Sequence, residues 1–354
     1  MDAWEGELAK WGGPDWVVGA VGGFAMDYLD APEPFLTGIR ELDTLAGGLP
    51  RGEVTVLAGE AGMGKTALAC QLAYHAAMRG ERPLYCSFEM SRLKCLMRMV
   101  ACHAALNPHM MDELPEPARE VRWSSARPHP DALAQVRQIR SFSATDRDAA
   151  DAAVAQYARA YARQQPGTPV DAAMLAWSNM DMQVRQAGGM LVADSMRSLT
   201  DIESCVSACS EDGAARFVVV DYAQLVDTGD EKEYDRMATL SGGLRRLAKE
   251  HRTAVLVISA LRKLSGSDRK EGPAMDWLKG NNALAYDAGQ VLFLLRPDGD
   301  DGQPAPVRNV DLAIVKNRNG VSGGRCELSF DAPRNVIHSR WLRNGEQDTI
   351  GCWA

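Results

Sequence analysis

Short apolar runs alternate with amphipathic or alanine-rich stretches along most of the chain. Apolar runs rich in β-branched residues are typical of buried strands, and the stretches between them have the composition or the 3.6-residue period of helices. Strands are predicted at residues 53–58, 83–88, 190–193, 216–220, 254–259 and 290–295, with a hairpin from 309–315 and 325–330. Helices are predicted at residues 39–46, 67–78, 91–105, 148–165, 201–209 and 234–250.

This alternation predicts an α/β fold with a mostly parallel central sheet, helices on both of its faces and a C-terminal β-hairpin. In such sheets ligands bind at the carboxyl ends of the strands. Side chains that directly follow predicted strands are therefore the first candidates for a site.

A glycine-rich segment follows the first predicted strand and begins the next helix. It matches the pattern G-x-x-x-x-G-K-[ST], which is typical of the phosphate-binding loop of nucleoside triphosphatases. Its backbone N–H groups and the helix N-terminus would bind phosphates, Lys65 would reach the β- and γ-phosphates, and Thr66 would bind Mg²⁺. The predicted ATP-binding residues are Gly59, Glu60, Ala61, Gly62, Met63, Gly64, Lys65 and Thr66.

Two acids end later strands of the predicted sheet. Asp221 follows four apolar residues, as does the carboxylate that holds Mg²⁺ in phosphate-loop enzymes, although an ordinary buried strand with a capping Asp has the same pattern. Glu89 ends the strand after the phosphate-loop helix, where it is placed either as a general base or as a helix-terminal Glu favoured by the helix dipole. Ser91 is positioned to cap the next helix, which extends to Ala105.

The predicted C-terminal hairpin carries two cations next to an Asn-Gly pair. Lys316 and Arg318 have the charge needed to stabilise a phosphoryl-transfer transition state in a neighbouring subunit. The alternative is a solvated basic turn, because Asn-Gly, here Asn319-Gly320, is a strong hairpin-turn signal.

Composition narrows the class of protein. The 354 residues are 46% hydrophobic and 24% charged, with a net charge of −8, which is typical of a globular protein and excludes a uniformly basic nucleic-acid-binding surface. No apolar run is long enough to span a membrane, and the first residues do not resemble a signal peptide. The eight cysteines lack zinc-site spacing, so reduced thiols in a cytoplasmic protein are expected.

The pattern divides the chain into segments. Residues 1–36 are predicted to be an N-terminal arm, 37–331 the ATPase domain and 332–354 a C-terminal tail. Within the domain, residues 107–188 have proline-rich turns and alanine-rich helices, and they are predicted to be a helical insertion to which the sequence assigns no chemistry.

The motifs together resemble the C-terminal ATPase domain of DnaB-type replicative helicases, a branch of the RecA-like P-loop fold. The resemblance covers roughly residues 36–105 and 190–331. Besides the phosphate loop, it rests on the segments 37–43, 47–52, 87–91, 96–99, 220–225, 244–249, 286–288, 291–296 and 316–320.

The resemblance implies roles for these residues. Glu89 becomes the catalytic base, Asp221 the Mg²⁺-associated acid, and Arg318 with Lys316 a finger that acts on the ATP of a neighbouring subunit. The family forms homohexameric rings that hold single-stranded DNA in the central channel and work with replication partners such as a loader or primase. The basic residues of the segment matching its DNA-facing loops are Arg262, Lys263, Arg269, Lys270 and Lys279.

The chain also departs from this family. Where the family usually has Gln after the Ser at the end of a strand, this chain has Ala260, and that Gln is associated with coupling hydrolysis to DNA. Residues 1–36 are shorter than the family's N-terminal primase-interacting domain, and the 107–188 block is longer than its counterpart, so a phage- or plasmid-like relative is expected.

A hexameric DNA helicase is therefore the function that the sequence predicts first. Two alternatives stay open: a RecA/RadA- or KaiC-like ATPase without unwinding activity, and a nucleotide-gated loader or assembly protein whose partner surface is the 107–188 block. The solvated-loop interpretation of residues 262–282 also stays open, because Asp268, Glu271 and Asp276 offset the basic residues.

Overall fold

A computed structural model of the chain describes most of the predicted ATPase domain. The described residues are 32–112, 114, 120–127, 129–142, 147–164, 169–211, 215–264, 268, 272–279, 283–297, 303 and 305–339. The chain divides into the units Met1–Glu33 and Pro34–Ala354, and the elements below belong to the second.

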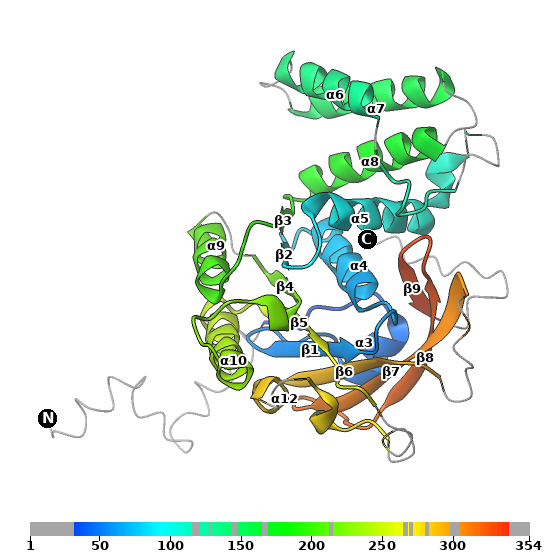
Figure 1. Cartoon of the computed structure of the whole chain (residues 1–354). Helices are drawn as coiled ribbons and strands as arrows, with labels where there is room; N and C mark the ends of the chain where they lie inside the picture. Colours follow the sequence, from blue (N-terminus) through cyan, green and yellow to red (C-terminus); the bar gives the residue numbers. More distant parts are fainter. Residues whose placement is uncertain are drawn as a thin grey trace, which may run out of the picture. The chain divides into compact units, whose positions relative to one another are not determined.

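A nine-stranded sheet forms the centre of this unit (Figure 1). Its strand order is β3-β2-β4-β5-β1-β6-β7-β8-β9. The six strands from β3 to β6 pair in parallel, and β7, β8 and β9 continue the sheet in antiparallel pairs. The strands are β1 (Val54–Gly59), β2 (Leu84–Ser87), β3 (Leu191–Ala193), β4 (Phe217–Asp221), β5 (Ala254–Ala260), β6 (Gln290–Leu295), β7 (Val307–Asn317), β8 (Arg325–Asp331) and β9 (Val336–Ser339).

Helices cover both faces of the sheet, as the alternating pattern predicted. They are α3 (Arg40–Ala46), α4 (Lys65–Met78), α5 (Arg92–Leu106), α6 (Pro130–Phe142), α7 (Arg147–Gln164), α8 (Pro169–Gln186), α9 (Leu199–Glu211), α10 (Glu233–His251) and α12 (Ala283–Asp287). Short 3-10 turns are formed by Pro108–Met111, Ala223–Leu225 and Met275–Trp277. Among the described helices, none has the length and apolarity that crossing a membrane requires.

The strands bury alternate residues in two separate cores. In β1, Leu57 belongs to the core that also contains residues of α3, α4, α5 and α8, whereas Val56 and Ala58 belong to the core formed with α9, α10 and α12. This two-sided burial explains why the strands are continuously apolar instead of alternating with polar residues. The same alternation in β4 places Phe217 and Val219 on the α4 side of the sheet, and Asp221 continues that series.

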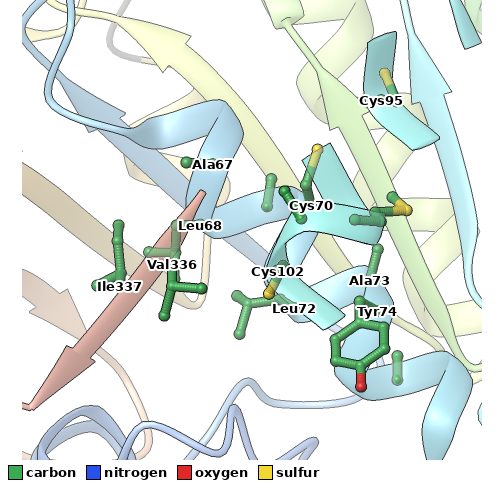
Figure 2. Packing of buried hydrophobic residues seen from close by; sticks show 14 of the residues in the cluster. Ala67, Leu68, Cys70, Leu72, Ala73, Tyr74, Cys95, Cys102, Val336 and Ile337 are labelled. Carbon is green, nitrogen blue, oxygen red and sulfur yellow. The ribbon is translucent and has the colours of Figure 1, made fainter. Parts of the chain in front are cut away.

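The phosphate-loop helix α4 is buried around most of its circumference. Figure 2 shows residues of α5 (Cys95 and Cys102) and of β9 (Val336 and Ile337) against it. Its composition of Ala and Leu without a polar stripe fits a helix that neighbours surround. The amide of Gln71 donates to the Ile337 carbonyl oxygen at 2.8 Å and accepts from the Ile337 N–H at 2.7 Å, which holds β9 beside the helix.

Strand β9 lies within residues 332–354, which the sequence pattern set apart as a tail. Its hydrogen-bond partners are β8, which is separated from it by only four residues, and the side chain of Gln71, which is distant in sequence. The boundaries of the predicted arm, domain, insertion and tail otherwise remain predictions.

The predicted insertion contains the helices α6, α7 and α8. The pattern predicted a helix at 148–165, and α7 occupies nearly the same range. A small separate core joins the three helices; its buried residues are Ala132, Val136, Val154, Ala158 and Met174. Arg140 of α6 forms ion pairs with Asp151 and Asp181, one on each of the other two helices.

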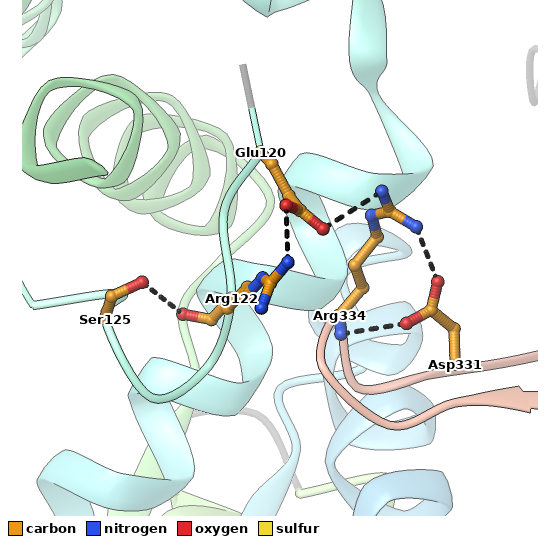
Figure 3. A network of polar contacts seen from close by, with 5 residues as sticks. All are labelled: Glu120, Arg122, Ser125, Asp331 and Arg334. Atoms are coloured by element: carbon orange, nitrogen blue, oxygen red, sulfur yellow. Dashed lines mark hydrogen bonds and ion pairs between the residues drawn. The ribbon is translucent and has the colours of Figure 1, made fainter. Parts of the chain in front are cut away.

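A polar cluster ties the start of this block to the turn between β8 and β9 (Figure 3). Arg334 in that turn pairs with Glu120 at 3.2 Å and with Asp331 at 2.7 Å, and Arg122 also pairs with Glu120. The N–H of Trp123 donates to the Pro333 carbonyl oxygen at 2.9 Å. These contacts hold the turn that leads into β9.

A buried histidine joins α4 to α5 and α8. His103 is fully buried between the hydroxyl of Tyr74 and the amide oxygen of Asn179, each 2.8 Å from a ring nitrogen. Since the Asn179 oxygen only accepts, the neutral ring donates there through Nε2 and accepts from Tyr74 at Nδ1. Burial lowers the pKa of His103 to about 4.

We predict that His103 makes the protein less stable in acid. Its folded-state pKa lies below the unfolded value of 6.5, so its contribution is complete above pH 6.5 and is lost as the pH falls towards 4. The loss amounts to about 3 kcal/mol. Urea unfolding at several pH values should show a shallower acid decline for His103→Gln than for wild type. The exposed-residue variant His129→Gln should decline as wild type does; equal slopes for all three proteins would contradict the assignment.

Candidate functional site

The phosphate loop connects β1 to α4 at the carboxyl edge of the parallel strands. Gly64 has a φ of +96° and precedes the first residue of α4, and a Cβ there would lie 3.0–3.1 Å from the Phe330 ring of β8. A Cβ on Gly59 would lie 2.4 Å from the Leu294 carbonyl oxygen. Glycine is therefore required at one position by conformation and packing, and at the other by the close approach of a neighbouring strand.

Lys65 points back into the loop. Its ammonium group donates to the carbonyl oxygens of Gly59 at 2.8 Å and Glu60 at 3.0 Å. Burial lowers the pKa of Lys65, while the negative charges of Asp221, Glu89 and Glu60 oppose that shift. The predicted lysine and both predicted acids therefore lie close enough to interact electrostatically at one edge of the sheet.

Asp221 ends β4 and is almost completely buried, with 1% of its surface exposed. The phenol of Tyr85 donates to its Oδ2 at 2.7 Å, and the hydroxyl of Thr66 lies 3.5 Å from its Oδ1. Burial raises the pKa of Asp221 and the charge of Glu89 adds to this, whereas the two hydrogen bonds and Lys65 lower it. The peptide bond between Asp221 and Tyr222 is cis.

Glu89 lies in the exposed turn between β2 and α5. The buried hydroxyl of Ser87 donates to the Met90 carbonyl oxygen at 2.7 Å and accepts from the Met90 N–H at 3.2 Å, which shapes this turn. Helix α5 begins only at Arg92, so Glu89 precedes its N-cap residue and is not a first-turn acid. Glu89 is therefore not part of the helix, and its role, as a general base or as an acid near the helix N-terminus, stays a prediction.

The predicted cap of α5 is also wrong in detail. Ser91 occupies the N-cap position, but its side chain makes no capping hydrogen bond. Instead, the carboxylate of Asp194, which follows β3, accepts from the Arg92 N–H at 2.7 Å. A carboxylate brought in by tertiary structure takes the place of the local serine.

Lys316 and Arg318 lie at the amino-terminal end of the parallel strands, whereas the phosphate loop lies at their carboxyl end. Asn317 pairs with Gln290 at the start of β6, whereas Gly59 pairs with Leu294 near the end of that strand. Four residues of strand separate the two levels, a rise of about 13 Å. Arg318 is thus displaced from its own chain's phosphate loop along the strand direction.

Both cations contact the C-terminal end of α12. The Lys316 ammonium donates to the carbonyl oxygens of Ala285 at 2.8 Å and Tyr286 at 2.7 Å, and the Arg318 guanidinium donates to Tyr286 at 2.7 Å. Burial and the charge of Arg318 lower the pKa of Lys316. The turn is solvated at residues 318–320, and helix-terminal carbonyl groups hold both cationic side chains.

The expected tight turn at Asn319-Gly320 is not formed. Neither residue has a positive φ, which a two-residue Asn-Gly turn requires. The β7–β8 ladder ends at Ala313 and Arg325, and beyond it β7 continues to Asn317 paired with β6 only. The hairpin is confirmed, but pairing with β6 overrides its local turn signal.

Buried amides support the cationic end of β7. Gln290 donates to the carbonyl oxygens of Ala46 at 3.0 Å and Gly48 at 2.9 Å, and Asn317 donates to that of Ala46 at 3.2 Å. The Asn317 side chain also accepts from the Asn319 N–H at 3.1 Å. These bonds anchor the residues around Arg318 to the C-terminus of α3.

The basic residues expected to contact DNA have different environments. Arg262 forms a two-bond ion pair with Asp268 at 2.7 and 2.9 Å and lies 3.5 Å from Asp276, so acids already neutralise its charge. Lys263 and Lys279 are exposed. The other two members of the set, Arg269 and Lys270, lie outside the described residues.

Three side-chain contacts near the site had no signal in the sequence. Tyr85 looks like an ordinary apolar strand residue, although its phenol contacts Asp221. Arg308 of β7 donates to the Gly62 carbonyl oxygen and lies over the Phe330 ring, 5.1 Å from its centroid. Gln224 bonds to the Ser259 hydroxyl at 2.9 Å and to the Ala260 N–H at 3.4 Å. Each contact joins two strands or loops that are far apart in the sequence. The contacts are therefore visible only in the folded structure.

We predict that Gly64→Ala destabilises the protein more than Gly52→Ala. Gly52 also has a positive φ, +76°, but a Cβ there meets no atom within 4 Å. Both variants incur the left-handed conformational cost of about 1–2 kcal/mol, and only Gly64→Ala adds a clash with Phe330. Free energies of unfolding measured in urea test the difference. Equal losses would show that Phe330 does not constrain the loop.

Comparisons with known proteins agree with this fold. A model of the DnaB-like helicase C terminal domain family matches residues 35–137 and 168–337. The match is interrupted, within the predicted 107–188 insertion, only by the stretch that contains α7. A solved structure of an ATPase domain superposes with a TM-score of 0.63 at 18% identity, covering 92% of this chain and 98% of that one. A DnaB-like replicative helicase, whose structure was studied together with its interactions with primase, gives a TM-score of 0.64 at 17% identity over 90% of this chain and 66% of its own.

The curated relatives are considerably longer than this chain. The replicative DNA helicase DnaB of Geobacillus stearothermophilus is 23% identical over 302 residues, which are 83% of this chain and 54% of the relative. That of Haemophilus influenzae is 24% identical over 304 residues, again 83% of this chain and 53% of the relative. The chain thus spans about half the length of the curated relatives it matches. Since the family match extends over most of the chain, including the phosphate loop and the strands around it, the chain belongs to the DnaB-like helicase C-terminal domain family.

Proposed function

We propose that the chain is an ATP-dependent DNA helicase motor of the DnaB type. It hydrolyses ATP at the interfaces of a hexameric ring, translocates on single-stranded DNA and unwinds duplex during replication. One observation carries the proposal. Lys65, Thr66 and Asp221 meet at one edge of the sheet, within the electrostatic reach of Glu89, and Lys316 and Arg318 lie at the other edge. Family membership supports an ATP-hydrolysing enzyme of this kind.

The phosphate loop has the features that a nucleotide requires. Gly62 and Gly64 have φ values of +79° and +96°, which a loop closing around phosphates needs. The Lys65 ammonium, now bonded to two loop carbonyl oxygens, can exchange those bonds for phosphate oxygens. Asp221 and Thr66 place two hard oxygen ligands 3.5 Å apart, a donor set that suits Mg²⁺. When bound, Mg²⁺ would neutralise charge on the phosphate oxygens.

Hydrolysis would proceed by in-line attack of water on the γ-phosphate of ATP, which breaks the bond from the γ-phosphorus to the bridging oxygen and releases ADP and phosphate. Glu89 orients this water and accepts its proton, since it lies in the exposed turn after β2 and its charge acts on Lys65. Lys65 stabilises the charge on the transferring phosphoryl group. A cation from the neighbouring subunit completes the site.

Sheet geometry favours a shared active site. Arg318 and Lys316 lie about 13 Å along the strand direction from the level of their own phosphate loop, and the α12 carbonyl groups hold them there. A role in hydrolysis therefore requires the loop of another chain. Repeating such a head-to-tail contact generates a ring when the rotation closes, which accords with a homohexamer.

Single-stranded DNA would bind through backbone contacts in the centre of the ring. Lys263 and Lys279 are the exposed cations available among the described members of the predicted set, with Arg269 and Lys270 as further candidates. Contacts of this type depend on phosphate charge, so little sequence specificity is expected. A replication protein such as a loader or primase is the expected partner, and the cytoplasm the expected location.

A DNA-dependent ATPase without unwinding activity is the second candidate, and Ala260 favours it. This residue ends β5 next to Gly59 and presents no side-chain amide to a nucleotide. A RecA/RadA- or KaiC-like machine with this feature would hydrolyse ATP and bind DNA without separating a forked duplex.

We predict that single-stranded DNA stimulates ATP hydrolysis and that the protein assembles with a six-subunit mass. The ATPase rate with and without an oligonucleotide should be measured together with native mass at the same protein concentration. Strand separation on a forked duplex then distinguishes a helicase from the second candidate. A monomer whose rate ignores DNA would contradict both.

We predict that Glu89→Gln nearly abolishes turnover in this assay. The substitution keeps the size of the side chain but removes the base, so turnover should fall by about 10²–10⁴-fold while ATP binding is retained. Normal turnover in this variant would refute the assigned base.

We further predict that two inactive variants complement each other when mixed. Glu89→Gln subunits keep Arg318, and Arg318→Ala subunits keep Glu89, so an interface between them can carry both functional groups. Random assembly of equal amounts leaves about a quarter of the interfaces intact. ATPase activity of the mixture should exceed that of either variant alone. A mixture as inactive as its components would argue that the site is not shared between chains.

A further inference from the structure

The carboxylate of Asp221 is held by a side chain that has no assigned role. The Tyr85 hydroxyl donates to Asp221 Oδ2 at 2.7 Å, and both residues are buried, with 0% and 1% of their surfaces exposed. Within β2 and β4, Tyr85 pairs with Val219, two residues before Asp221 and on the same face of the sheet. The phenol therefore reaches along the strand direction to the carboxylate.

The contact belongs to a closed set of hydrogen bonds around the start of α4. Cys70 lies one turn after Thr66 on this helix, and its thiol donates to the Tyr85 oxygen at 3.6 Å. Tyr85 donates to Oδ2 of Asp221, and Thr66 donates to Oδ1 at 3.5 Å. The set thus links the phosphate-loop helix to the strand that ends in the acid, through one phenol on β2.

The two carboxylate oxygens therefore have different tasks. Oδ2 accepts a short hydrogen bond from a buried phenol, whereas Oδ1 faces Thr66 at a distance too long for a strong bond. A carboxylate held at one oxygen cannot rotate freely, so its second oxygen is presented in a single direction. That direction is towards the hydroxyl which, with Asp221, forms the hard oxygen donor pair.

We propose that Tyr85 is a positioning residue that orients the Asp221 carboxylate for the divalent cation bound with the nucleotide. The inference rests on the proposed ATPase function and names one further residue of that site. Tyr85 contacts neither the nucleotide nor the cation in this scheme. It acts through Asp221, as hydrogen bonds from outside the ligand shell orient ligating carboxylates in metal sites.

Tyr85→Phe tests this role because it removes the hydroxyl and keeps the buried ring. Tyr74→Phe is the matched control. Tyr74 lies in the second half of α4, and its hydroxyl is also buried but bonds to His103 of α5. The full-length chain should be titrated with a fluorescent, non-hydrolysable ATP analogue in EDTA and at increasing Mg²⁺. Thermal unfolding of both variants establishes that they are folded.

We expect Tyr85→Phe to need about tenfold more Mg²⁺ for half of the metal-dependent gain in affinity, the scale of one hydrogen bond to a charged group. Its affinity in EDTA should equal that of wild type. Tyr74→Phe should match wild type in both conditions. In an Asp221→Asn background, Tyr85→Phe should have no further effect, because the two residues act as one unit.

The possible failures are distinguishable. A wild-type protein that binds the analogue equally with and without Mg²⁺ would overturn the proposed function and this inference together. If wild type depends on Mg²⁺ and Tyr85→Phe does so identically, the role of Tyr85 alone is overturned. Equal weakening of Tyr85→Phe in EDTA and in Mg²⁺, or an undiminished effect in the Asp221→Asn background, would likewise overturn it by showing a general structural effect.

Discussion

The burial of helix α4 is the constraint on which the rest of the structure depends. The helix must extend from the phosphate loop into the protein, so it needs neighbours on nearly every side: the sheet, α5 and β9. Gln71 holds β9 in place, and Phe330 of the adjoining strand β8 supports the loop beneath Gly64. The antiparallel extension of the sheet and the cluster around Arg334 therefore serve the same end as the parallel strands, which is a fixed direction for the first turn of α4.

The charged residues are distributed unevenly between the two ends of the central strands. The carboxyl edge gathers one lysine and several acids, including the desolvated Asp221, whereas the opposite edge holds Lys316 and Arg318 on the last carbonyl groups of α12. A rigid strand separates the two groups, so one chain cannot bring them together. If the proposed function holds, assembly and catalysis are linked because each subunit carries complementary parts of two different sites.

Local sequence rules succeeded where neighbours agreed with them and failed where a distant partner competed. The six parallel strands and most helices were predicted near their observed bounds, because burial on both faces requires long apolar runs. At Asn319-Gly320 the turn signal was overridden by pairing of β7 with β6, and at Ser91 a carboxylate from after β3 took over the cap. Strand β9 was not predicted, although it forms a local hairpin with β8; its contact with Gln71 joins residues far apart in sequence.

The sequence by itself determined the fold class, the phosphate loop and the strand-end position of Asp221, because these depend on residue types at fixed local spacings. Glu89 could be placed after its strand, and the structure adds that it lies in an exposed turn two residues before the N-cap of α5. Only the tertiary structure decided which groups face one another. The contacts of Tyr85 with Asp221, Arg308 with Gly62 and Gln224 with Ser259 depend on strand order and register, and residues 35 to 246 positions apart meet there through the packing of the whole sheet.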